Sequence, residues 1–225
     1  MALAVSDIAH GDTIVYNLKS QFSTSQNPNG PWSYNLGSSH ITQPIADAHL
    51  IGWGWDPSWD GSIVQRISPD PIYQQHDWIV GDIVIHSLSW CYGGQSEFGN
   101  ITWTSPSAGT ISISGLAWDA GFFAGRDTSW DLTVDGTLLA SRSSVYDLYR
   151  TDPEASFANN LLSGKSLTDI PVQAGDVVTF QVEATTYYGH WVGIDEVITL
   201  TPVPEPATLF LLGLGSLALL RKRGK

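Results

Sequence analysis

Short runs that alternate between apolar and polar side chains fill the chain from Asp12 to Thr201. Residues 110–114 read Thr-Ile-Ser-Ile-Ser, the period of two of a half-buried strand, whose successive side chains point to opposite faces. Turn residues interrupt these runs, and Asp135-Gly136 has the composition of a tight hairpin. Only residues 154–162 are expected to form a short helix. The pattern predicts an all-β fold, an antiparallel β-sandwich.

Composition narrows the class of protein further. The chain has 225 residues, of which 42% are hydrophobic, and this is enough apolar material for a folded core. A single cysteine excludes an intramolecular disulfide framework and a cysteine-based zinc site. The net charge of −12 argues against a nucleic-acid partner, because neutralising phosphates requires lysine and arginine.

The last 23 residues differ in character from the rest of the chain. Pro204-Glu205-Pro206 is followed by an uncharged run from Ala207 to Leu220, and then by the basic residues Arg221, Lys222, Arg223 and Lys225. The chain up to Pro206 carries six basic and 22 acidic residues, whereas the remainder carries only four positive charges. We expect a C-terminal hydrophobic helix that acts as a transmembrane segment, with the basic end on the cytoplasmic side. The alternative is a buried C-terminal helix in a soluble domain.

This order of proline-glutamate-proline, apolar run and basic cluster resembles the PEP-CTERM sorting signal of Gram-negative bacteria, also called the ice-binding protein C-terminal domain. The resemblance implies that an exosortase-type processing enzyme recognises Pro204, Glu205 and Pro206. It also implies a transient anchor in the inner membrane, followed by processing and a place at the cell surface or outside the cell, often beside exopolysaccharide. We therefore divide the chain into residues 1–11, the remnant of a signal peptide, residues 12–201, the β-sandwich, and residues 202–225, the sorting tail.

The second half of the body also resembles a known fold. The phrases at residues 103–115, 130–139, 172–182 and 193–200 resemble those of the carbohydrate-binding-module type of jelly roll in secreted bacterial proteins. The resemblance implies two antiparallel sheets and a structural calcium ion. Asp119, beside a glycine-rich stretch, and Asp195, beside Gly193, are the candidate calcium ligands. The alternative is that both are solvated acids with no metal.

The segment from Gly52 to Gly61 is the candidate binding loop. It places Trp55, Asp56, Trp59 and Asp60 on a glycine-rich loop, where a flat aromatic ring can stack on a sugar and acids can bond its hydroxyls. The alternative is that these tryptophans belong to the sandwich core, as most of the others are expected to.

No motif for catalysis accompanies these features. The chain has no His-Glu-x-x-His, no Gly-x-Ser-x-Gly and no phosphate-binding loop, and Thr102, Thr104 and Thr110 do not form the regular array of an ice-binding face. We expect an exported surface or exopolysaccharide-associated protein whose body is a non-catalytic carbohydrate-binding module. The alternatives are a structural matrix protein without a defined ligand and a glycoside hydrolase or lyase.

Overall fold

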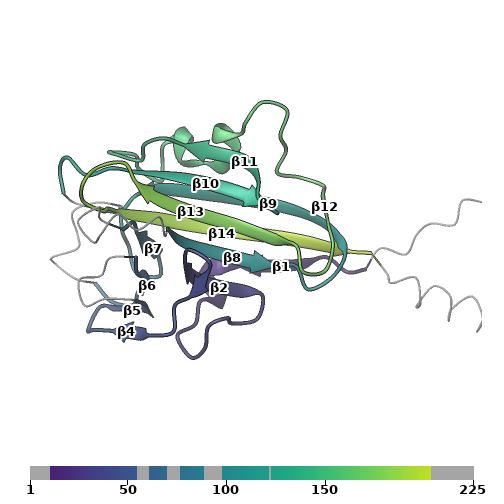
Figure 1. The fold of residues 1–225 in the computed structure, drawn as a ribbon, viewed down its shortest axis with the longest axis horizontal. Coiled ribbons are helices and arrows are strands. Elements are labelled where there is room, and N and C mark those ends of the chain that lie inside the picture. Colours follow the sequence, from purple (N-terminus) through teal and green to yellow (C-terminus); the bar gives the residue numbers. More distant parts are fainter. Residues whose placement is uncertain (1–10, 55–60, 70–76, 89–97, 122, 204–225) are drawn as a thin grey trace, which may run out of the picture.

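The computed structural model describes residues 11–54, 61–69, 77–88, 98–121 and 123–203. Within them the chain forms two antiparallel sheets (Figure 1), which confirms the predicted all-β class. The first sheet has the order β12-β9-β14-β7-β6-β5-β4, with β1 also paired to β14, and the second has the order β11-β10-β13-β8-β2-β3.

The strands of the first sheet are β1 (Ile14–Asn17), β4 (Pro44–Ala46), β5 (Leu50–Trp53), β6 (Ile63–Arg66), β7 (Ile83–His86), β9 (Gly109–Asp119), β12 (Ile170–Val172) and β14 (Trp191–Pro202). Those of the second are β2 (Trp32–Leu36), β3 (Ser39–His40), β8 (Gly99–Thr104), β10 (Thr128–Val134), β11 (Thr137–Arg142) and β13 (Val177–Ala184). The described helical segments are α1 (Leu18–Gln21), η2 (Pro153–Ala155) and η3 (Phe157–Asn160).

Local sequence explains the turns and the short helices. Asp135 and Gly136 both have positive φ, which is the backbone of the tight hairpin expected between β10 and β11. The helix expected over residues 154–162 is instead two 3₁₀ segments, η2 and η3. Ser156 separates them in an extended conformation and caps η3 by accepting a hydrogen bond from the Ala158 N–H.

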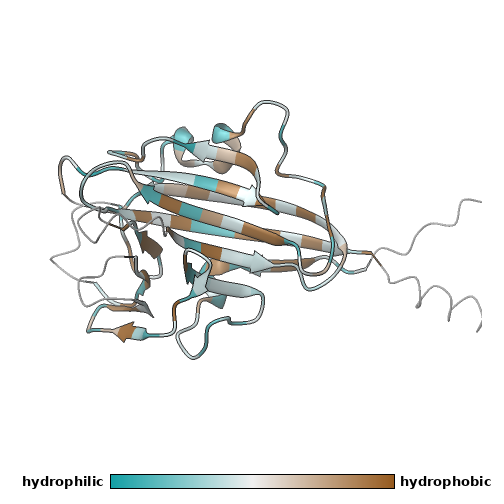
Figure 2. Cartoon of the chain, in the orientation of Figure 1, coloured by the Kyte–Doolittle hydropathy of each residue, from teal (hydrophilic) through white to brown (hydrophobic). Residues whose placement is uncertain are grey.

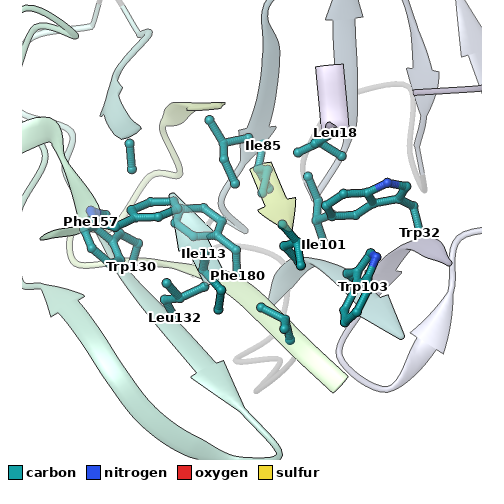
Figure 3. Packing of buried hydrophobic residues seen from close by; sticks show 14 of the residues in the cluster. Leu18, Trp32, Ile85, Ile101, Trp103, Ile113, Trp130, Leu132, Phe157 and Phe180 are labelled. Carbon is teal, nitrogen blue, oxygen red and sulfur yellow. The ribbon is translucent and has the colours of Figure 1, made fainter. Parts of the chain in front are cut away.

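The main core lies between the two sheets (Figure 3). Hydropathy alternates along the strands (Figure 2), so one face of each strand contributes apolar side chains to this core. Trp130, Phe157 and Phe180 pack together with ring centroids 5.3–5.7 Å apart. Every tryptophan that the structure describes is buried, as expected for most of them: Trp32, Trp53, Trp78, Trp103, Trp118, Trp130 and Trp191.

A second apolar cluster covers the opposite face of the first sheet. Trp118 and Trp191 belong to it, and Trp78 and Leu148 from the neighbouring loops cover them. Charges hold this cover in place: Arg150 lies 4.3 Å from the centre of the Trp118 ring and is paired with the carboxylates of Asp77 and Asp82. Around Trp118 the first sheet is therefore buried on both sides, whereas the second sheet has an open outer face.

An ionisable residue, Glu196, faces the main core. Glu196 on β14 alternates with Ile194 and Ile198 and lies opposite Gly115 of β9. Its side chain is 1% exposed, and its Oε1 atom has no hydrogen-bond partner among the described residues. Burial raises the pKa of this carboxyl to about 8, so the acid is protonated at neutral pH.

The described body begins and ends at the same end of the sandwich (Figure 1). The Gly11 N–H donates to the Pro202 carbonyl at 3.3 Å, and the Val203 N–H donates to the Ala108 carbonyl at 3.0 Å. β14 thus runs to Pro202, and one residue, Val203, separates it from the proline-glutamate-proline sequence. The expected C-terminal hydrophobic helix lies outside the described residues, and within them no helix is long and apolar enough to cross a bilayer.

Candidate functional site

The open outer face of the second sheet carries a groove of about 340 Å³ lined mainly by polar side chains. Its floor comes from β2, β8 and β13, whose inward-facing residues belong to the main core. Because Phe180 and Val182 point into the core, Thr179 and Gln181 of β13 point outward. The lining residues are Ser33, Asn35, Gly37, Ser38, His40, Asn100, Thr102, Thr104, Val177, Thr179 and Gln181.

Strand register arranges these side chains in rows across the sheet. Residues directly opposite each other in antiparallel strands share a face, and neighbouring strands lie ~4.8 Å apart. One row is Ser33, Thr102, Thr179 and Thr133, and the next is His40, Asn35, Asn100, Gln181 and Asp131. The rows place hydroxyl and amide groups at regular intervals across β2, β8, β13 and β10.

Hydrogen bonds hold one half of the groove rigid. The Asn35 side-chain amide donates to the Asn100 carbonyl oxygen Oδ1 at 3.0 Å, and the Asn35 Oδ1 atom lies 2.6 Å from Nδ1 of His40. Ser33 and Thr102 share a hydrogen bond between their hydroxyls. These groups are preorganised by one another, so a ligand would meet them in a fixed geometry.

In the other half of the groove, three polar side chains are free to bond to a ligand. The side chains of Thr104, Thr179 and Gln181 make no hydrogen bond within the described part of the chain, and all three line the groove. They offer donors and acceptors for a ligand that carries several hydroxyl groups.

A second hollow, of about 430 Å³, extends this face. It is lined by residues 36, 39–43 and 54, and His40 lines both hollows. Gly54 directly precedes the segment in which Trp55, Asp56, Trp59 and Asp60 were predicted to bind a ligand. Those four residues lie outside the described residues, so their role stays a prediction; the polar surface does lead to the start of that segment.

The two candidate calcium ligands lie on opposite faces of the first sheet. Asp119 is opposite Val192, a residue of the main core, whereas Asp195 is opposite Leu116 on the other face. A single ion therefore cannot contact both carboxylates. Within the described residues no group of three or more histidine, cysteine, aspartate or glutamate side chains is placed to hold a metal.

Asp119 has protein partners instead. Its Oδ1 atom accepts a hydrogen bond from the Gly121 N–H and lies 2.8 Å from Nε2 of His190, while its Oδ2 atom accepts from the Asp147 N–H. Asp119 and His190 are each about 2% exposed. Sequence reasoning missed this buried pair, because 71 residues separate its members.

Comparison with known proteins assigns the tail. An all-β body of two antiparallel sheets precedes a segment, residues 202–223, that matches the PEP-CTERM protein-sorting motif. The chain therefore carries a PEP-CTERM sorting signal, as predicted, and this signal implies export through an exosortase. Pro204, Glu205 and Pro206 fall inside the matched segment, which lies almost entirely outside the described residues.

Solved structures resemble the body only distantly. The K3 cleaved adhesin domain of Lys-gingipain from Porphyromonas gingivalis w83 is 13% identical, with a TM-score of 0.37, and the match covers 83% of this chain and 98% of that one. The catalytic domain of a GH87 α-1,3-glucanase in complex with nigerose is 10% identical, with a TM-score of 0.33 and 86% and 29% coverage. No curated protein matches this chain.

Proposed function

We propose that this chain is an exported bacterial protein whose body binds a polysaccharide, without catalysis, along the outer face of the second sheet. The observation that carries the proposal is the registered polar face, where the side chains of Thr104, Thr179 and Gln181 make no hydrogen bond within the described part of the chain. A polysaccharide chain repeats its hydroxyl groups, so it can pair with side chains that repeat from strand to strand. The body is then a carbohydrate-binding module of the jelly-roll type.

The tail accounts for where the protein goes. In this proposal an exosortase recognises Pro204, Glu205 and Pro206 while the apolar run from Ala207 to Leu220 holds the chain transiently in the inner membrane. Processing leaves the body at the cell surface or outside the cell. Since β14 ends at Pro202, the tail leaves the body directly from its last strand.

Of the two candidate calcium ligands, Asp195 is the one that we retain in this proposal. The Asp119 carboxylate already takes hydrogen bonds from two N–H groups and pairs with His190, whereas the half-buried Asp195 side chain has no hydrogen bond within the described residues. A calcium ion needs six to eight oxygens, so further ligands would have to join Asp195. Calcium should raise the melting temperature of the full chain and EDTA should lower it, and Asp195→Asn should abolish this difference. A melting temperature that does not change when calcium is added would rule the ion out.

Binding to the sheet face is tested with paired variants. The full chain is applied to a glycan array and to affinity gels that contain candidate polysaccharides. The double variant Thr179→Val, Gln181→Leu removes two free polar groups and should lower the affinity about tenfold. Thr199→Val, on the outer face of the first sheet, is the matched control and should bind normally. Trp55→Ala and Trp59→Ala test whether the predicted loop contributes stacking.

Each alternative has its own outcome. Binding that survives the double variant and both tryptophan variants would refute the proposed surface. The absence of binding to any glycan would favour a structural matrix protein without a defined ligand. Release of oligosaccharides from a bound polysaccharide over time would favour a glycoside hydrolase or lyase.

A further inference from the structure

A separate hollow lies at the end of the sandwich away from the sorting tail. β9 runs from Gly109, beside the tail, to Asp119, and the antiparallel β14 starts one residue after His190. The eleven residues of β9 span roughly 35 Å, so Asp119 and His190 meet far from the point where the tail leaves. The hollow has a volume of about 90 Å³ and is lined by Asp119, Gly121, Phe123, Ala124, Tyr146, Asp147 and His190.

His190 has one ring nitrogen without a partner among the described residues. Its Nε2 atom is paired with Asp119 at 2.8 Å, but its Nδ1 atom is buried and makes no hydrogen bond there. A buried polar nitrogen without a partner destabilises the folded state, so the fold would be expected to satisfy it. In the neutral ring, a proton on Nε2 directed at the Asp119 carboxylate leaves Nδ1 as an acceptor for an incoming donor.

Gly121 packs closely against the His190 ring. A Cβ atom at Gly121 would lie 2.1 Å from Cε1 and 2.6 Å from Nδ1 of the His190 ring. A side chain at this position would therefore displace the ring or cover Nδ1. Gly121 and His190 both line the hollow, so the ring that carries the unpartnered nitrogen borders it.

The surroundings select the chemistry of a ligand. Two aromatic side chains, Phe123 and Tyr146, line the hollow and are 42% and 44% exposed. The carboxylates of Asp119 and Asp147 also line it, and they disfavour an anion. A metal ion would find a single free nitrogen, the Asp147 carboxylate and an Asp119 carboxylate already engaged by three partners, and no group of three or more potential ligands in the described part of the chain is placed to hold one. The volume of the hollow is that of about three water molecules. It can therefore admit one hydroxyl-bearing edge of a ligand, but a polysaccharide chain could not pass through it.

We infer that this hollow binds a small neutral polyol end-on, the terminal residue of a saccharide being the fitting class, with a ligand hydroxyl donating to Nδ1 of His190. The exposed ring of Tyr146 then contacts the apolar face of the sugar. This second site is independent of the proposed sheet face, because the two share no lining residue.

The test observes the nitrogen directly. The full chain, labelled with ¹⁵N in its histidine rings, is titrated separately with glycerol, D-glucose, D-galactose and N-acetyl-D-glucosamine. His190→Gln assigns the His190 signals by their loss. We expect at least one probe to move the Nδ1 signal of His190 upfield in a saturable way, as a new hydrogen bond to an unprotonated nitrogen requires.

Two tyrosine variants distinguish binding in the hollow from binding elsewhere on the chain. Tyr146→Ala leaves the Asp119–His190 pair in place and should weaken the response at least about fivefold. Tyr187→Ala, a similarly exposed tyrosine that does not line the hollow, is the matched control and should not weaken it. No response of Nδ1 up to ~100 mM of every probe would overturn the inference and leave ordered water as the occupant. A shift of the Nδ1 signal that is equally strong in the Tyr146→Ala variant would overturn it as well.

The sheet-face variant keeps the two proposals distinguishable. If the double variant Thr179→Val, Gln181→Leu loses polysaccharide binding but retains the His190 response, both sites stand. If polysaccharide binding is never found and the His190 response persists, only the sheet-face proposal fails.

Discussion

Glu196 makes the stability of this protein depend on pH in a direction opposite to that of most acids. The pKa of this carboxyl is raised from 4.5 to about 8 by burial in the main core. Between these two values the folded state holds a proton that the unfolded state has released, so rising pH favours unfolding. The stability is therefore fully present below about pH 4.5 as far as this group is concerned, and it is lost as the pH rises toward 8.

The size of the effect follows from the shift. Each pKa unit corresponds to about 1.4 kcal/mol, so the full change is roughly 5 kcal/mol between acidic pH and pH above 8. This is a large share of the roughly 5–15 kcal/mol that usually separates folded and unfolded states. In the window between, the free energy of unfolding should fall by about 1.4 kcal/mol per pH unit.

Two substitutions separate charge from polarity. Glu196→Gln cannot ionise, so the slope from this position should disappear although a buried polar group remains. Glu196→Met fills similar space without a polar atom, so it should also remove the slope and add about 1–3 kcal/mol by eliminating an unpaired oxygen. Glu183→Gln, on the exposed face of β13, is the matched control and should leave the slope unchanged.

The assay is urea unfolding of the full chain, followed by tryptophan fluorescence at several pH values between about 5.5 and 8.5. All described tryptophans are buried, so their emission reports the loss of the cores. A wild-type stability that rises with pH across this range, or a slope that Glu196→Gln leaves intact, would refute the reasoning.

Three other perturbations have defined outcomes. Burial alone would raise the pKa of Asp82, but hydrogen bonds from Arg150, Lys19 and the Ile79 N–H lower it, so its contribution is present above its ordinary pKa and is lost as the pH falls through the lower folded value. Asp82→Asn should cost roughly 3–5 kcal/mol in urea unfolding by leaving Arg150 without one of its carboxylates, and an unchanged midpoint would contradict this. Gly193→Ala should lower the melting temperature, with a loss of about 1–3 kcal/mol, because its Cβ would lie 2.2 Å from Cε2 of the buried Trp118; equal melting would show that the ring can move. Glu205→Ala in the native host should leave unprocessed chain in the membrane fraction on immunoblots, and normal processing would argue against recognition of the motif.

Features that depend only on residues close together in the sequence could be predicted from the sequence alone. The period-two alternation at residues 110–114 predicts a half-buried strand because backbone geometry sends successive side chains to opposite faces. Asp135-Gly136 predicts a tight hairpin because both positions need positive φ. The proline-glutamate-proline sequence, apolar run and basic end are contiguous, so the sorting signal could be identified without a fold.

Tertiary structure decided which distant residues meet. Asn35, Asn100 and Gln181 form one row only because β2, β8 and β13 are neighbours in a particular register, and local alternation carries no information about which strands pair. Asp119 and His190 meet for the same reason, where β9 ends beside the start of β14. A strand pattern states that two faces differ, but only the packing of the second sheet and the covering loops determines which face is buried and which one stays open to a ligand.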